Sequence, residues 1–101
     1  MNPKFRGMLS LAMRAGKLAV GEAKATDAVR QEKAHLLLLA EDAGPNTEKK
    51  VTDMGAYRQI PVLRLGKREE IGAAIGKKFA VVVAVTDTGF SEQLSTLFEN
   101  N

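Results

Sequence analysis

The 101-residue chain contains no cysteine, a single histidine, and few aromatic residues, which make up 5% of it. The absence of cysteine excludes a disulfide framework, thiolate metal sites and a cysteine nucleophile, and it suits a reducing compartment. No apolar run approaches the roughly 18 residues that a membrane helix needs. The first 13 residues also lack the long apolar stretch and small-residue cleavage site of a secretory signal. We therefore expect a cytoplasmic protein.

The residues that are present are those of an ordinary globular domain, with 45% apolar and 27% charged side chains. The length predicts one domain, over residues 1–101. The net charge of +3 is unevenly spread, because residues 1–33 carry +4 and residues 64–78 carry +3, whereas residues 79–101 carry −3. Two basic segments can converge into one phosphate-binding face, or they can form an ordinary solvated surface.

Helical and extended segments alternate along the chain. One predicted strand includes four leucines in a row, as expected for a strand covered on both faces, and a β-branched run forms another. Strands are predicted at residues 18–20, 35–40, 60–64 and 80–86. Helices are predicted before Gly16, from Gly21 onward, up to Gly55, over residues 68–75, and after Ser91 as N-cap. This alternation predicts an α/β fold, a three-layer α/β/α sandwich whose sheet is at least partly parallel.

Two glycine-containing segments have the approximate spacing of phosphate loops. In residues 16–21 the glycines are correctly spaced, but Glu22 follows where a lysine is needed to hold phosphates. In residues 72–78 the glycines are one position too close, and Lys78 replaces the hydroxyl residue that would bind magnesium. Neither segment predicts nucleotide hydrolysis.

The remaining polar residues form no recognisable catalytic set. His35 heads the leucine run, where a buried or edge histidine with a structural role is expected. Glu41 and Asp42 are interpreted as capping and shaping the turn before Pro45. Without a nucleophile–base pair or a metal-ligand cluster, the sequence predicts no enzyme, no metal, no cofactor and no small-molecule substrate.

Binding is the function that the sequence favours. A helix that begins at Gly21 presents free backbone N–H groups without a side chain to block them, which suits a phosphate or a base edge. The loop at residues 65–68 combines an apolar residue, a glycine and two positive charges. Neither segment contains an aromatic residue, so stacking of single-stranded bases is disfavoured. A reader of RNA shape and backbone fits better.

Several motifs together resemble one known family. Residues 21–29 (GEAKATDAV) align with its helix opening, G-x-N-E-x-T-K-A, and residues 36–42 (LLLLAED), followed by Pro45, match its apolar strand and A-E-D turn. Residues 60–61 (IP) and 71–76 (IGAAIG) match its I-P and L-G-x-A-x-G positions. The chain resembles the superfamily of ribosomal proteins L-seven-Ae and L-thirty-e, which bind kink-turn RNA. Its opening residues are similar to those of the small bacterial YlxQ-type ribosomal-like proteins.

The resemblance implies a central mixed four-stranded sheet and an RNA site made by the helix start and a facing basic loop. Ala23, Lys24 and Asp27 stand where the family has Asn, Glu and Lys, so the side chains that read base edges are replaced. Lysines and arginine would then hold phosphates. The expected RNA-binding residues are Lys17, Gly21, Glu22, Ala23, Lys24, Asp27, Leu65, Gly66, Lys67 and Arg68.

Two functions remain open at this point. The first is a non-catalytic, monomeric RNA-binding protein of ribosomal type, associated with the ribosome or another structured RNA and not with membranes. The second is a protein-interaction module on the same fold that has lost base-specific RNA recognition. Asp27, a negative charge on the expected RNA face, favours the second.

Overall fold

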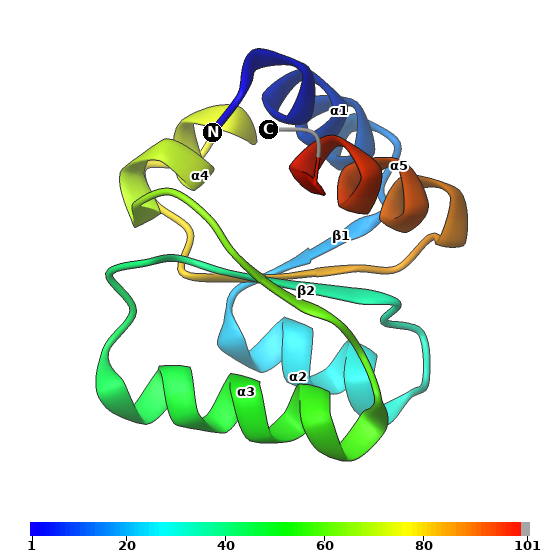
Figure 1. The fold of residues 1–101 in the computed structure, drawn as a ribbon, viewed down its shortest axis with the longest axis vertical. Coiled ribbons are helices and arrows are strands. Elements are labelled where there is room, and N and C mark those ends of the chain that lie inside the picture. The colour runs from blue at the N-terminus through cyan, green and yellow to red at the C-terminus, as the bar shows by residue number, and fades with distance from the viewer. Residues whose placement is uncertain (100–101) are drawn as a thin grey trace.

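The computed structural model describes residues 1–99, in which helices and strands alternate as the sequence predicts. Helices α1, α4 and α5 cover one face of the sheet and α2 and α3 cover the other, which confirms the three-layer sandwich (Figure 1). No helix within residues 1–99 is long and apolar enough to cross a membrane. The elements are α1 (Pro3–Arg14), β1 (Leu18–Val20), α2 (Glu22–Arg30), β2 (Leu36–Leu39), α3 (Pro45–Arg58), β3 (Val62–Arg64), α4 (Arg68–Ala74), β4 (Val82–Val85) and α5 (Thr88–Glu99).

The four strands form one mixed sheet in the order β1-β4-β2-β3. Strand β4 pairs antiparallel with β1 and with β2, whereas β2 and β3 are parallel. The two central strands are buried at every position, and their side chains alternate between the two faces. Leu36 and Leu38 pack toward α1, α4 and α5, and Leu37 and Leu39 pack toward α2 and α3. The continuous leucine run therefore reflects a sheet with helices on both sides.

Two helix boundaries differ from the predictions. Helix α5 begins at Thr88, because the Asp87 carboxylate accepts a hydrogen bond from the Phe90 N–H at 2.9 Å and caps the helix four residues before Ser91. Ser91 is buried inside the helix instead of capping it. Helix α3 continues past Gly55 to Arg58. A Cβ at Gly55 would lie 2.5 Å from Val62 Cγ2, so this glycine permits close packing of α3 on β3 and does not end the helix.

The topology gathers four chain segments at one end of the sheet. Strands β1, β2 and β3 end there and β4 begins there, because β4 runs antiparallel to β1 and β2. Hydrogen bonds close this end: Gly21 N–H donates to Val82 O at 2.8 Å and Ala40 N–H donates to Val81 O at 2.9 Å. We call it the Gly21 end. At the opposite end Thr86 N–H donates to Lys17 O at 2.9 Å.

Candidate nucleic-acid interface

Helix α2 begins abruptly at Gly21. The backbone there has φ 101° and ψ 154°, a conformation that L side chains rarely adopt, so the position requires glycine. Gly21 O accepts the first helical hydrogen bond, from Ala25 N–H at 2.9 Å, and no side chain of the described residues 1–99 caps the helix. The N–H groups of the first turn therefore remain available, and the helix dipole adds partial positive charge to them.

Glu22, the first helical residue, faces α3 and is bonded within the protein. Its carboxylate accepts hydrogen bonds from Lys50 Nζ at 3.1 Å and from Thr47 Oγ1 at 3.0 Å. The hydrogen bond from Lys50, then that from Thr47, lowers the pKa of Glu22 below its ordinary value. The sequence predicts Glu22 as an RNA contact; in the structure its carboxylate ties the start of α2 to α3.

A cavity of about 270 Å³ opens beside the start of α2. Four separate segments contribute to it: the β1–α2 junction, the start of α3, the start of α4, and the residues that lead into β4. Phe79 is 59% exposed, although most large apolar residues of the protein are buried. The lining residues are Val20, Gly21, Glu22, Gly44, Thr47, Arg68, Phe79, Ala80, Val81 and Val82.

The loop between α4 and β4 carries Phe79 and two exposed cations, Lys77 and Lys78. Its path is set by backbone contacts: Lys77 N–H donates to Gly72 O and Ala80 N–H donates to Arg68 O, both at 2.9 Å. A Cβ at Gly72 would lie 2.5 Å from the Phe79 Cα, so glycine allows the loop to rest on α4. Neither of the two predicted binding segments contains an aromatic residue, but the structure brings Phe79, from a third segment, to the helix start. The antiparallel pairing of β1 and β4 places Phe79 beside Gly21.

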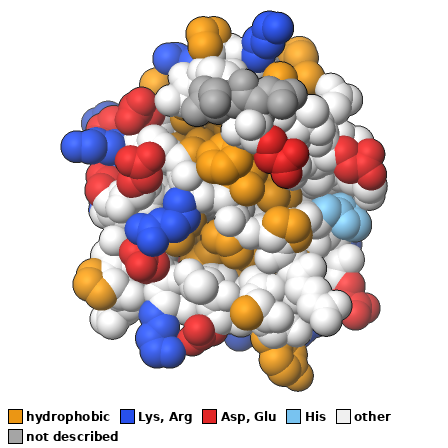
Figure 2. Space-filling model, in the orientation of Figure 1, with side chains coloured by type: hydrophobic (Ala, Val, Ile, Leu, Met, Phe, Trp, Pro, Cys, Tyr) orange, Lys and Arg blue, Asp and Glu red, His pale blue; other side chains and the backbone are white. Residues whose placement is uncertain are grey.

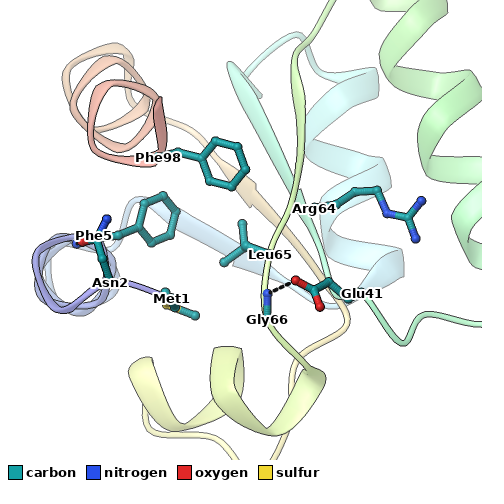
Figure 3. A pocket seen from close by; sticks show the side chains of 8 residues that line it. All are labelled: Met1, Asn2, Phe5, Glu41, Arg64, Leu65, Gly66 and Phe98. Carbon is teal, nitrogen blue, oxygen red and sulfur yellow. Dashed lines mark hydrogen bonds between the residues drawn. The ribbon is translucent and has the colours of Figure 1, made fainter. Parts of the chain in front are cut away.

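The loop at residues 65–68 only partly reaches this surface. Leu65 is 4% exposed and packs in the core, and the buried Gly66 donates its N–H to Glu41 Oε1 at 3.1 Å. Both line a second cavity, of about 220 Å³, on the other face of the sheet, where Phe5 and Phe98 also contribute to the lining (Figure 3). Only the last two residues of the loop face outward: Lys67 is exposed, and Arg68 lines the cavity beside Gly21.

Asp42 holds Arg68 in place. Its carboxylate accepts hydrogen bonds from Arg68 N–H at 3.0 Å and Arg68 Nε at 3.3 Å, and its carbonyl accepts one from the Arg68 guanidinium at 2.7 Å. Together with the Glu41–Gly66 bond, these contacts join the β2–α3 loop to the start of α4. Glu41 and Asp42 therefore bridge two loops. The sequence interpretation, that they cap the turn before Pro45, is not what the structure shows.

The Asp42–Arg68 contact makes stability depend on pH. Partial burial raises the pKa of Asp42, but the hydrogen bonds and charge of Arg68 outweigh it and hold the pKa below its ordinary value. A lowered pKa stabilises the fold at pH values above the ordinary pKa, about 4, and this contribution disappears as the pH falls through the folded-state pKa.

We expect Asp42→Asn to lower the melting temperature at pH near 7 and to have little effect at pH about 2. Asp53→Asn, which breaks an exposed ion pair with Lys49, is the control. If the loss of melting temperature in Asp42→Asn persisted unchanged in acid, the stabilising role of the ionised Asp42 would be contradicted.

The other predicted residues are distributed over two ends of the molecule. Ala23 and Lys24 are exposed in the first turn of α2, and Asp27 is exposed farther along the same helix. Lys24 forms no ion pair within residues 1–99. Lys17 lies at the opposite end of β1 and is not brought together with Gly21. His35, expected to be buried or at an edge, is exposed near Lys17.

Charges of both signs are interspersed on the side of the molecule where α4 lies (Figure 2). Several acids there are already bonded to cations or backbone groups, as Asp42, Glu41 and Glu70 show. The lysines of the α4–β4 loop form no ion pair within residues 1–99. The structure contains no group of three His, Asp or Glu side chains placed to hold a metal ion in that same range.

The structure thus combines a mixed β1-β4-β2-β3 sheet with a helix that starts at a glycine and a loop that packs on α4. Comparison with known sequences then identifies the family. The sequence model of the ribosomal protein L7Ae/L30e/S12e/Gadd45 family matches residues 4–95. The chain belongs to this family. The match spans every element up to the middle of α5, so the family accounts for all three layers of the fold.

Relatives within the family include RNA-binding and ribosomal proteins. The RNA-binding protein YlxQ of Bacillus subtilis is 45% identical over 92 residues, which cover 91% of this chain and 92% of the relative. YlxQ of Enterococcus faecium is 40% identical, with 95% and 92% covered. The large ribosomal subunit protein eL30 of Spodoptera frugiperda is 32% identical, with 91% and 83% covered. These names are not those of enzymes, in agreement with the prediction that the chain is non-catalytic.

Solved structures agree with the fold. A protein of unknown function from Bacillus halodurans superposes with a TM-score of 0.93 at 41% identity, covering 97% of this chain and 99% of that one. The Giardia lamblia 15.5kD RNA binding protein superposes with a TM-score of 0.81 at 15% identity, covering 99% and 89%. The second likeness shows the shared fold alone.

Proposed function

We propose that this chain is a non-catalytic protein that binds structured RNA of the kink-turn type through the Gly21 end of its sheet. The observation that carries the proposal is the cavity in which an uncapped helix start, Arg68 and the exposed ring of Phe79 meet. The names of the YlxQ and eL30 relatives support RNA as the partner. Ribosomal or other structured RNA in the cytoplasm is the expected target.

Phosphate contacts would provide most of the affinity. Lys24, Lys67, Lys77 and Lys78 are all exposed, and all belong to segments that reach the Gly21 end. None forms an ion pair within the described part of the chain, so their charges are free to neutralise phosphates. The open N–H groups of α2 add donors for one further phosphate or base edge. Binding should therefore weaken steeply as salt is raised.

The cavity would provide the preference for a kinked RNA over a straight duplex. Its volume of about 270 Å³ and the exposed face of Phe79 suit one unpaired base that has left the helical stack. A kinked RNA offers such a base, whereas a continuous duplex must first break a pair. Ala23 and Lys24 cannot accept hydrogen bonds through their side chains, so recognition would rest on shape and stacking more than on base edges.

A titration with two RNAs tests the proposal. The protein should bind a kink-turn RNA more tightly than a straight duplex of equal length, and both affinities should fall with salt. Fluorescence anisotropy at several salt concentrations measures the dissociation constants of both RNAs. Absence of binding to either RNA at low salt would contradict RNA binding altogether, and equal affinity for the two would contradict recognition of the kink.

A protein-interaction module is the second candidate. Asp27 projects a negative charge from α2 near the proposed RNA surface, and Glu22 is bonded to α3 instead of being free for RNA. A pull-down from cell extract separates the two functions, because partners held through RNA disappear after nuclease treatment and direct protein partners remain.

A further inference from the structure

Helices α1 and α5 lie side by side on the outer layer and carry opposite charges (Figure 1). They run antiparallel, since Asn2 Nδ2 donates to Leu97 O at 3.1 Å and the rings of Phe5 and Phe98 lie 6.3 Å apart. The exposed positions of α1 include Lys4, Arg6 and Arg14 and no acid, and those of α5 include Glu92 and Glu99 and no Lys or Arg. No ion pair within residues 1–99 joins the two helices.

Apolar side chains occupy the middle of this face. Leu11 is 47% exposed and is the most exposed leucine among the described residues. Met8 of α1 and Leu97 of α5 are half-buried and line a shallow groove between the helices. An apolar centre flanked by charged residues is the usual composition of a protein–protein interface.

Gly7 lies at the centre of the outer side of α1. A glycine inside a helix is less favourable than alanine, and a Cβ added here would meet no atom within 4 Å. Nothing within residues 1–99 therefore requires glycine at this position. A bare helix surface does allow a second backbone to approach closely, as small residues do at helix–helix contacts.

We propose that the face formed by α1 and α5 is where two copies of this chain associate. A two-fold axis parallel to the helices places the basic α1 of each copy over the acidic α5 of the other, with Met8, Leu11 and Leu97 around the axis. A two-fold axis across the helices would place α1 on α1 and bring like charges together. Charge complementarity thus selects both the occupant and its orientation.

This inference goes beyond RNA binding and departs from the monomer that the sequence suggested. RNA is a weaker occupant for this face, because the acids of α5 lie directly beside the cations of α1 and repel phosphate. The face also lies on the α1–α4–α5 layer, away from the start of α2. Both surfaces can therefore be occupied in the same molecule.

Sedimentation velocity with charge-reversal variants tests the proposal. The protein should show a concentration-dependent monomer–dimer equilibrium that weakens with salt. Lys4→Glu with Arg14→Glu should raise the dissociation constant at least about tenfold, as should Glu92→Lys with Glu99→Lys. An equimolar mixture of the two double variants should associate more tightly than either alone. Lys49→Glu with Arg58→Glu, on the opposite layer, makes the same charge change and should leave the constant unaltered.

Substitution of Gly7 supplies an independent readout. Gly7→Gln has room for its side chain within one copy, so thermal stability at low concentration should not fall, whereas association should be lost. A protein that stays monomeric to about 1 mM at low salt, a mixture that associates no better than its parts, or a Gly7→Gln variant that dimerises normally would each overturn the proposal.

Discussion

Replacement of Gly72 by alanine will destabilise the protein and displace the loop that carries Phe79. Helix propensity alone would favour alanine at this position of α4. The added Cβ would, however, lie 2.5 Å from Phe79 Cα and 2.9 Å from Lys77 O, both backbone atoms that cannot turn aside as a flexible side chain does. We expect a loss of about 2–3 kcal/mol in the free energy of unfolding, measured by urea denaturation.

Gly7→Ala is the matched control, because it makes the same change in a helix where the Cβ meets nothing. At concentrations where the protein is monomeric, it should raise stability by about 0.5–1 kcal/mol, opposite in sign to Gly72→Ala. Gly72→Ala should also weaken RNA binding, since the displaced loop holds one wall of the cavity. If Gly72→Ala were as stable as the unaltered protein, the close contact between α4 and its following loop would be refuted.

The second large effect is expected at Phe79. Phe79→Ala should weaken RNA binding by about 1–3 kcal/mol, or roughly 5- to 150-fold, because one base loses its stacking partner. Stability should change little, since the ring is more than half exposed. Phe79→Ala should leave the salt dependence of binding unchanged. Lys77→Ala with Lys78→Ala should instead lower the slope of log affinity against log salt concentration by up to about two. Fluorescence anisotropy over a salt series separates these two contributions.

Tyr57 provides the control for this experiment. It is also an exposed aromatic residue, at 84%, but it lies near the C-terminal end of α3, away from Gly21. Tyr57→Ala should therefore leave RNA affinity unchanged, and Phe79→Trp should retain most of it. An RNA affinity that is equally insensitive to Phe79→Ala would show that no base stacks in this cavity.

The layers and strands of the fold were readable from the sequence because each has a local pattern. The four leucines of β2 and the β-branched run of β4 are buried at every position, as a sheet covered on both faces requires. Strand β1 occupies the predicted residues, 18–20. The helix boundaries at Gly55 and Ser91 were not readable, because a tertiary contact with Val62 and a competing cap from Asp87 decide them.

The candidate site could be predicted only in part from the sequence, because some of its residues come together through long-range pairing. Gly21 and Lys24 lie in one local motif, but Phe79 joins them through the pairing of β1 with β4, which connects residues almost 60 positions apart in the sequence. Leu65 and Lys17 do not lie on the surface of the Gly21 end, for two different reasons. Leu65 turns into the core beside Phe5, and Lys17 precedes the strand that Gly21 follows, so the length of β1 separates them.

The contact between Gly72 and the α4–β4 loop has a consequence for how this protein can evolve. The path of the loop depends on backbone atoms and one glycine, and not on the side chains of Lys77, Lys78 and Phe79, which are exposed. Mutations at these three positions can therefore accumulate without a penalty in folding. A lineage that keeps Gly72 can explore new RNA preferences, one exposed side chain at a time, on an unchanged scaffold.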